Sequence, residues 1–173
     1  MGTEARWYVI QVQTGREEQI MEEAGKYQVQ EYFDEIFAPR MERKKKYLGK
    51  WHLETGLLFP GYLFVISSRP KELYQALKRV PQLTKLLGTG EKWTPMTEED
   101  IAAVEALSGK ERLMKFSEGY IQGDSVTVIS GPLKGLEGKI SRNDRHKRLA
   151  WLTVELFGRT VELQAGLEIV RKE

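Results

Sequence analysis

The chain contains no cysteine and only two histidines, His52 and His146. Disulfide bonds and thiolate metal sites are therefore excluded. The two histidines stand in segments of different character, and no glycine-rich phosphate loop or metal-ligand cluster accompanies them. Carboxylates are plentiful but scattered, which is typical of solvated faces rather than of paired acid–base groups. We therefore predict a protein that is not an enzyme and that uses no metal or cofactor.

Long apolar runs are also missing from the sequence. No stretch of the 173 residues approaches the roughly 20 apolar residues that a membrane-spanning helix needs, and residues 1–6 do not have the layout of a signal peptide. Apolar residues make up 40% and charged residues 30%, which is ordinary for globular proteins. We expect a cytoplasmic monomer of one or two domains with no membrane contact.

An apolar run at 62–66 is the strongest strand signal in the chain. Its aromatic, aliphatic and β-branched residues predict a strand that is buried on both faces. Phe59, Pro60 and Gly61 precede it and predict a sharp corner, because proline fixes φ and glycine adopts backbone angles that other residues avoid. We expect this corner to push Phe59 outward. An apolar corner at the rim of a sheet can serve as a partner surface.

Other helices and strands of residues 1–107 follow from local patterns. Thr14 and Glu17 match a capping box that would start a helix, Pro70 suits the first turn of a second helix, and Thr97 would cap a third. Strands are expected at 6–12 and 33–37, with a short strand or turn at 86–88. These elements predict an α/β sandwich, in which helices pack on a mainly antiparallel sheet.

Residues 40–51 form the densest basic segment. Six lysines and arginines stand there against Glu42 alone. We interpret the segment as a β-hairpin that turns near Leu48-Gly49. Two interpretations of its charge remain open: a solvated edge hairpin that lysines protect from pairing, or a nucleic-acid contact.

The C-terminal third has the pattern of a small β-domain. Residues 108–118 are polar and predict a linker, although Leu113, Met114 and Phe116 could dock on another element. Five short strands are then expected, at 125–129, 136–141, 150–156, 160–163 and 167–170, with Phe157-Gly158 as a two-residue hairpin connection. Such a pattern predicts a small closed barrel. The predicted fold class is therefore α+β.

Charge is unevenly distributed, although the formal net charge is only +2. Residues 1–107 carry 15 basic and 16 acidic side chains, whereas residues 108–173 carry 12 and 9. A second basic cluster lies at 141–148, a predicted loop between barrel strands, with four lysines and arginines, one aspartate and one histidine. The sequence thus predicts two focused basic patches rather than a general polycation.

Taken together, the motifs resemble the NusG family of transcription elongation factors. The N-terminal resemblance rests on Trp7–Ile10, Leu58–Val65, Leu87-Gly88 and Pro95–Thr97; the C-terminal one rests on Gly123–Val128 and Gly131–Gly138, the signature of a KOW domain. The resemblance implies a NusG N-terminal domain at 5–107, a linker at 108–118 and a five-stranded KOW barrel at 119–173.

In this family the N-terminal domain binds the clamp helices of RNA polymerase and catalyses no bond-making step. The resemblance implies that the apolar corner is this site, formed by Phe59, Pro60, Tyr62 and Leu87. By bridging the cleft of the polymerase, such a factor favours the elongating state and opposes pausing and termination.

The two basic patches depart from the general members of the family, whose KOW barrel often binds a ribosomal protein or the termination factor Rho. A loop of this charge suits RNA phosphates and base edges. The chain is similar to specialised paralogues of the LoaP type, which a leader RNA hairpin recruits to particular operons. The expected RNA-binding residues are Lys134, Arg142, Asn143, Arg145, His146, Lys147 and Arg148, with a secondary nucleic-acid contact at Arg43, Lys44, Lys45 and Lys46.

Two alternatives remain open. The first is a general elongation factor whose KOW domain binds a ribosomal protein or Rho, which would make the basic loop incidental. The second is a ribosome-associated RNA-binding protein, because KOW barrels also occur in ribosomal proteins. The second leaves the apolar corner without a use.

Overall fold

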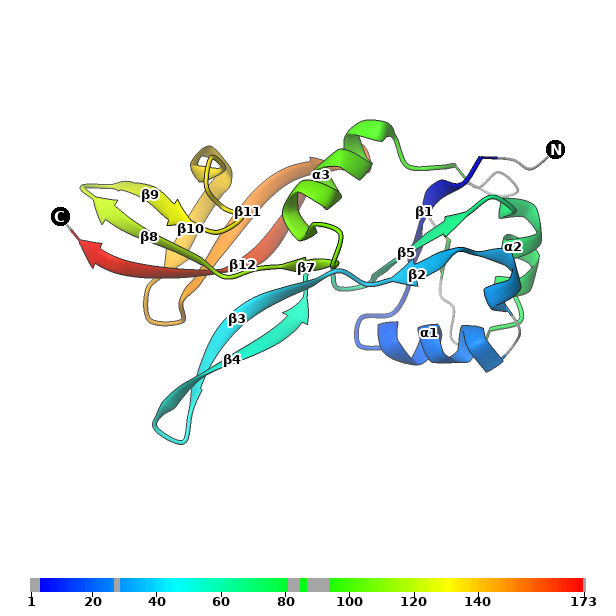
Figure 1. The fold of residues 1–173 in the computed structure, drawn as a ribbon, viewed down its shortest axis with the longest axis horizontal. Coiled ribbons are helices and arrows are strands. Elements are labelled where there is room, and N and C mark those ends of the chain that lie inside the picture. The colour runs from blue at the N-terminus through cyan, green and yellow to red at the C-terminus, as the bar shows by residue number, and fades with distance from the viewer. Residues whose placement is uncertain (1–3, 27–28, 81–84, 87–93, 173) are drawn as a thin grey trace. The chain divides into compact units, whose positions relative to one another are not determined.

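The protein is described by a computed structural model that covers residues 4–26, 29–80, 85–86 and 94–172 (Figure 1). Its contacts form two compact units. The first unit comprises Met1–Ala38 and Phe59–Ile101, and the second comprises Pro39–Leu58 and Ala102–Glu173. The basic hairpin of the N-terminal half thus belongs to the same unit as the C-terminal half. The two units are therefore not two consecutive segments of the chain. Within the described residues, no helix is long and apolar enough to cross a membrane.

The first unit is a four-stranded antiparallel sheet with helices. Its strands lie in the order β2-β5-β1-β6, and helices α1 and α2 pack beside them (Figure 1). The elements are β1 (Arg6–Gln11), α1 (Glu17–Lys26), the 3-10 turn η1 (Val29–Tyr32), β2 (Glu35–Phe37), β5 (Tyr62–Ser67), α2 (Pro70–Leu77) and β6 (Lys85–Leu86). This arrangement confirms the predicted helices on an antiparallel sheet. The expected turn at 87–88 lies outside the described residues.

Strand β5 is the centre of this sheet, as its sequence predicts. It pairs with β1 on one side and with β2 on the other, and the side chains of Leu63, Phe64 and Val65 are fully buried. Leu63 and Val65 belong to the core that also holds Ile20 of α1 and Leu73 of α2. Because successive side chains of a strand alternate between faces, Phe64 is buried on the opposite face.

The helix starts were predicted with mixed success. Pro70 occupies the first turn of α2 as expected, and the hydroxyl of Thr97 accepts the N–H of Asp100 at 3.1 Å, which caps the third helix. The capping box at Thr14 is wrong. The helix begins at Glu17, whose buried carboxylate accepts the N–H of Gly15 at 2.6 Å and the N–H of Gly61 at 3.1 Å.

This use of Glu17 explains the apolar corner and corrects the expectation for Phe59. Gly61, at φ +89°, also accepts the N–H of Val12 at 2.8 Å through its carbonyl oxygen. The corner is therefore drawn against the sheet, and Phe59 is only 2% exposed. Its ring packs edge-on against Phe64, with centroids 5.3 Å apart. A buried aromatic ring contributes more to the stability of the fold than a ring exposed at the rim of the sheet.

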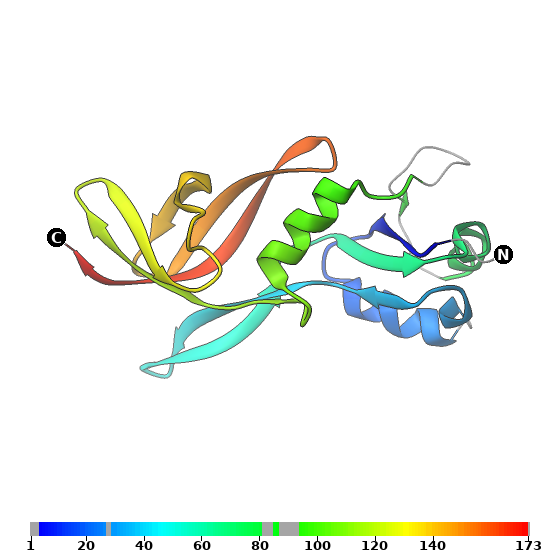
Figure 2. The ribbon, with the colours of Figure 1, turned by 45° about the horizontal axis from the view of Figure 1, so that its top comes forward.

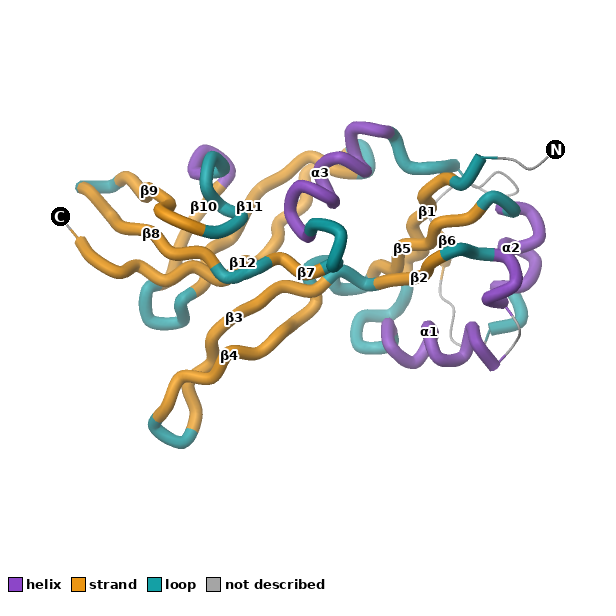
Figure 3. Tube along the Cα trace, viewed as in Figure 1, coloured by secondary structure: helices purple, strands orange, loops and turns teal. Residues whose placement is uncertain are grey.

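The second unit consists mainly of strands (Figure 3). The hairpin sheet has the order β4-β3-β7, and the larger sheet has the order β10-β11-β12-β8-β9. The elements are β3 (Arg40–Tyr47), β4 (Lys50–Leu57), the C-terminal part of α3 (Glu98–Ser108), β7 (Leu113–Met114), β8 (Ser117–Gln122), β9 (Ser125–Ser130), η2 (Glu137–Lys139), β10 (Ile140–Asp144), β11 (Leu149–Leu156) and β12 (Arg159–Lys172). The C-terminal part is thus the predicted β-rich domain of an α+β fold.

Both predicted two-residue turns are present. Leu48 and Gly49 join β3 to β4 with φ values of 53° and 74°, and Phe157 and Gly158 join β11 to β12 with 57° and 73°. Positive φ at both positions is the mark of a type I′ hairpin turn. The tip of the β3–β4 hairpin projects away from the larger sheet (Figures 1 and 2).

The segment expected as a linker carries structure of its own. β7 runs parallel to β3, and Met114 is 1% exposed. β8, which the strand prediction missed, then begins at Ser117 and pairs with β9 and β12. The apolar residues of this polar segment therefore dock, which is the behaviour that Leu113 and Met114 allowed for.

The two last predicted strands are a single strand, β12. Its first half pairs antiparallel with β11 up to Gly166, and its second half pairs parallel with β8 from Leu167. A Cβ at Gly166 would overlap the ring of Phe116 and the carbonyl oxygen of Glu42. Gly166 thus marks a close approach of backbones rather than a break between the strands expected at 160–163 and 167–170.

We predict that the β3–β4 turn is strained by its first residue. Leu48 holds φ 53° with its side chain 91% exposed, and leucine gains nothing there to offset the left-handed backbone. Leu48→Asn should raise the free energy of unfolding by about 0.5 kcal/mol, because asparagine tolerates this conformation. Urea unfolding measures the change. Leu48→Ala is the control, and an equal gain from alanine would contradict a backbone origin.

We predict a pH-dependent contribution from Glu137. Hydrogen bonds from its own backbone N–H and from the N–H groups of Val128 and Gly135 lower the pKa of its carboxyl below 4.5. A carboxyl whose pKa is lowered by folding stabilises the folded state when the pH is above the pKa of the unfolded chain. This stabilisation is lost as the pH falls through the lowered pKa of the folded state. Glu137→Gln should therefore cost about 0.5 kcal/mol at pH 7, a value limited by solvent screening.

The same loss should shrink toward zero below pH 4, as thermal unfolding at both pH values can measure. Glu118→Gln, at an exposed position of β8, is the matched control. A loss at Glu137 that stays constant across this range would show that the charge of the carboxylate does not matter.

Candidate nucleic-acid interface

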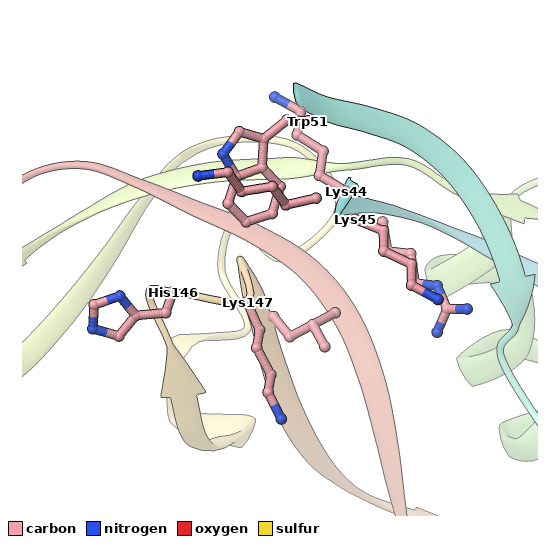
Figure 4. A pocket seen from close by; sticks show the side chains of 8 residues that line it. Lys44, Lys45, Trp51, His146 and Lys147 are labelled. Carbon is pink, nitrogen blue, oxygen red and sulfur yellow. The ribbon is translucent and has the colours of Figure 1, made fainter. Parts of the chain in front are cut away.

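The two basic segments of the sequence meet at one hollow of about 340 Å³ in the second unit. The hairpin provides one side and the loop between β10 and β11 provides the other (Figure 4). Both lie within the same compact unit. The lining residues are Arg43, Lys44, Lys45, Lys46, Trp51, His146, Lys147 and Leu149. The predicted secondary contact at 43–46 is therefore adjacent to part of the predicted RNA-binding loop.

On the hairpin side, the cations fall into two groups. Arg43 forms an ion pair with Glu54 at 3.2 Å, and Lys44 forms one with Glu168 at 3.4 Å. Lys45 and Lys46 are exposed, and among the described residues neither has a carboxylate within ion-pair distance. Two of the four cations are thus paired within the protein, and among the described residues the other two have no ion-pair partner.

On the other side, a four-residue loop connects Asp144 to Leu149. The carboxylate of Asp144 accepts the N–H of Lys147 at 3.0 Å, which tightens the loop. Arg145, His146 and Lys147 are exposed, and the ring of His146 points away from Trp51 (Figure 4). The loop therefore presents cations to solvent on a backbone that its own aspartate fixes.

Arg148 has a different environment from its neighbours. Its guanidinium lies 3.9 Å from the ring centroid of Trp51 and 2.9 Å from the carboxylate of Glu168. A second hollow of about 270 Å³, lined by Arg145, His146, Arg148, Glu168 and Ile169, adjoins this contact. Arg148 is thus engaged within the protein rather than displayed.

The remaining predicted RNA-binding residues do not line either hollow. Arg142 stacks on Trp151, its cross-strand partner, with the guanidinium 3.9 Å from the ring centroid. Asn143 is half-buried on β10, and Lys134 is exposed in the turn before η2. The structure therefore gathers His146 and Lys147 with the hairpin and leaves Arg142, Asn143 and Lys134 apart from them.

The sequence predictions missed Trp51 and Glu168. Trp51 stands opposite Lys46 in the hairpin pairing, and the only hint in the sequence is an aromatic residue within a charged segment. Glu168 offered no hint, because a single glutamate in a strand resembles any solvated residue. Yet Glu168 forms ion pairs with both Lys44 and Arg148.

The expected polymerase-binding corner lies in the first unit. Pro60 is exposed and Tyr62 is half-buried, whereas Phe59 is buried. Phe59, Phe64, Phe37 and Trp7 form a chain of ring contacts with centroids 5.3 to 5.6 Å apart. Leu87 lies outside the described residues. Phe59 therefore offers little surface of its own.

Comparison with known proteins places the chain in a family. The family model described as "Transcription termination factor nusG" matches residues 5–105, and the KOW motif matches residues 122–155. The transcription termination/antitermination protein NusG of Helicobacter pylori strain J99 is 26% identical over 173 residues, covering 96% of this chain and 97% of its own length. The NusG protein of Thermus thermophilus is 25% identical, covering 96% and 97%.

A solved structure agrees on the fold. The structure titled "Domain interaction in Thermotoga maritima NusG" superposes with a TM-score of 0.57 at 23% identity and covers 94% of both chains. The N-terminal match alone spans more than half of the 173 residues. The chain therefore belongs to the NusG family of transcription factors.

Proposed function

We propose that this NusG-family protein is a processive antiterminator that nascent RNA recruits to particular operons. The observation that carries the proposal is the hollow between the hairpin and the loop, where Lys45, Lys46 and Lys147 gather. An RNA stem-loop with its dense phosphates is the anion that suits such a site. The protein acts by binding and not by catalysis.

We further propose that the first unit binds the clamp helices of RNA polymerase through the apolar corner. Pro60 and Tyr62 supply the contact surface, and the neighbouring Phe59 ring is buried against Phe64. Rigid aromatic and proline side chains are effective anchors, because little conformational entropy is lost when they bind. Leu87 belongs to the same proposal.

The second candidate is a general elongation factor whose KOW domain binds a ribosomal protein or Rho. The similarity to NusG proteins along nearly the full chain favours it. Unlike our proposal, it gives the cations of the hairpin and loop no ligand.

We predict that RNA binding is salt-dependent and uses the loop. Arg145→Gln with Lys147→Gln should weaken binding of a leader stem-loop RNA and lower the slope of log K against log salt by roughly 1.4 to 1.8, because two phosphate contacts are lost and about 0.7 to 0.9 of a counterion is released per contact. Fluorescence anisotropy at several salt concentrations measures both quantities. The RNA is a stem-loop from the leader of the operon that adjoins the coding gene.

The matched control removes one arginine and one lysine from the first unit. Lys71 and Arg79 are exposed near α2, so Lys71→Gln with Arg79→Gln changes the net charge equally. This control should bind RNA like the wild type. If both double variants weaken RNA binding equally, the effect comes from overall charge and not from the loop. If the wild type does not bind RNA, the general elongation factor is favoured.

We predict that the corner and the loop act separately. Tyr62→Ala should weaken binding to purified RNA polymerase roughly 10- to 30-fold, the range for an interface anchor, and leave stem-loop RNA affinity unchanged. Phe59→Ala should instead lower the free energy of unfolding by about 3 kcal/mol, because it leaves a cavity where an aromatic ring was buried. Polymerase affinity that survives Tyr62→Ala would remove the corner from the interface.

A further inference from the structure

The base of the β3–β4 hairpin is fixed to the larger sheet of the second unit by specific contacts. The carboxylate of Glu42 accepts the N–H of Phe116 at 2.9 Å. Lys44 lies 4.6 Å from the ring centroid of Phe116 and 3.4 Å from the carboxylate of Glu168. At Gly166, the backbone of β12 comes so close to the carbonyl oxygen of Glu42 that no Cβ fits between them. These contacts hold the base of the hairpin in one place.

Arg148 extends this connection toward the loop. It stands in the left-handed region at φ 55°, an unfavourable conformation for a residue other than glycine. Its carbonyl oxygen accepts the N–H of Leu167 at 3.0 Å, and its guanidinium lies between the ring of Trp51 and the carboxylate of Glu168. Such an unfavourable backbone persists where surrounding contacts determine it.

Glu168 therefore receives one cation from each side. Lys44 comes from the hairpin and Arg148 comes from the loop. All three side chains are only 21 to 27% exposed, so water screens these pairs less than it screens surface pairs. Lys44 and Arg148, which join the two segments, share this one carboxylate. Among the described residues, Lys45, Lys46 and Lys147 at the shared hollow have no ion-pair partner.

The unneutralised cations stand on both sides of the same hollow. Lys45 and Lys46 come from the hairpin, and Lys147 comes from the loop. Like charges brought together repel each other and reduce stability. An edge hairpin needs lysines for protection, but that need does not explain why a second basic segment is fixed opposite them. A bound polyanion would offset the repulsion.

From this arrangement we infer that the hairpin and the loop bind one RNA stem-loop as a single surface, in which Arg148 is a positioning residue and not an RNA contact. The inference rests on the proposed function and deepens it. Lys45 and Lys46 contact one part of the phosphate backbone, and Arg145 and Lys147 contact another. Trp51, Arg148 and Glu168 set the separation of the two groups of cations.

The first test removes the hairpin charges. Lys45→Gln with Lys46→Gln should weaken stem-loop RNA binding about tenfold and lower the salt slope by roughly 1.4 to 1.8, as the loop double variant does. Single-stranded RNA of the same composition serves as the comparison probe, and the effect on it should be smaller because it does not span a fixed separation. The control is again Lys71→Gln with Arg79→Gln.

The second test breaks the positioning without removing charge. Arg148→Lys keeps the cation but cannot stack flat on Trp51, and Trp51→Leu removes the ring. Each should weaken RNA binding at least about threefold. The double variant should bind RNA as tightly as the weaker-binding of the two single variants, because both substitutions remove the same contact between Arg148 and Trp51. The salt slope should stay at its wild-type value. A direct phosphate contact at position 148 would instead tolerate lysine.

A third, purely steric variant is Gly166→Ala, which should separate the hairpin from β12 and reduce the effect of the Lys45 and Lys46 substitutions. Thermal unfolding checks that each variant is folded, and the two substitutions at Trp51 and Arg148 suffice if alanine at 166 prevents folding. RNA binding that needs the loop but is unchanged by the hairpin, Trp51 and Arg148 variants would overturn the single surface and leave the proposed function standing.

Two other outcomes identify other failures. A wild-type protein that does not bind stem-loop RNA in a salt-dependent way would overturn the proposed function itself. Displacement of the RNA by polyglutamate at equal charge concentration would assign the surface to an acidic protein partner, and so overturn the RNA assignment.

Discussion

The second unit depends on the change of partner within strand β12. Up to Gly166 this strand extends the β10–β11 hairpin, and from Leu167 it runs parallel to β8. At the point of change, Gly166 has no side chain, and β12 can therefore approach the backbone of β3 at Glu42. Because the hairpin grows from β3 and the basic loop leads into β11, this one approach brings together two segments that are far apart in the sequence. This approach and the contacts of Lys44 and Arg148 with Glu168 together hold the two segments in place.

Carboxylates perform a second structural task, since they bind backbone N–H groups where no strand can. Glu17 does so for Gly15 and Gly61, Glu42 for Phe116, and Glu137 for Val128 and Gly135. Hydrogen bonds to an ionised acceptor are stronger than those between neutral groups. Corners, bends and loops therefore have a firm attachment in a chain without disulfide bonds. In the sequence, Glu42 and Glu137 would pass for solvated residues, and Glu17 is assigned to a capping box instead.

The sequence could predict features that depend on neighbouring residues, but not those that depend on contacts between distant residues. Strand β5, the turns at Leu48-Gly49 and Phe157-Gly158, and the cap at Thr97 follow from neighbouring residues, and local patterns predicted them. The burial of Phe59, the length of β12 and the role of Trp51 depend on residues that are distant in the sequence. For the same reason, both basic segments could be predicted as candidate sites, but their meeting at one hollow could not. Glycine was the most ambiguous signal, because Gly49 permits a turn whereas Gly166 permits a close approach.

Membership of the NusG family explains the fold, and so the question of specialisation rests on side chains that the fold does not need. Lys44, Arg142 and Arg148 each contact an aromatic ring or a carboxylate of the protein, so their presence has a structural explanation. Within the described residues, Lys45, Lys46, Arg145 and Lys147 have no ion-pair or ring partner of this kind, and Lys45, Lys46 and Lys147 are held near one another at the hollow. Structure alone would favour their dispersal, because like charges repel. A polyanionic ligand is the simplest reason for a chain to keep them there, and the RNA of the proposed function is such a ligand.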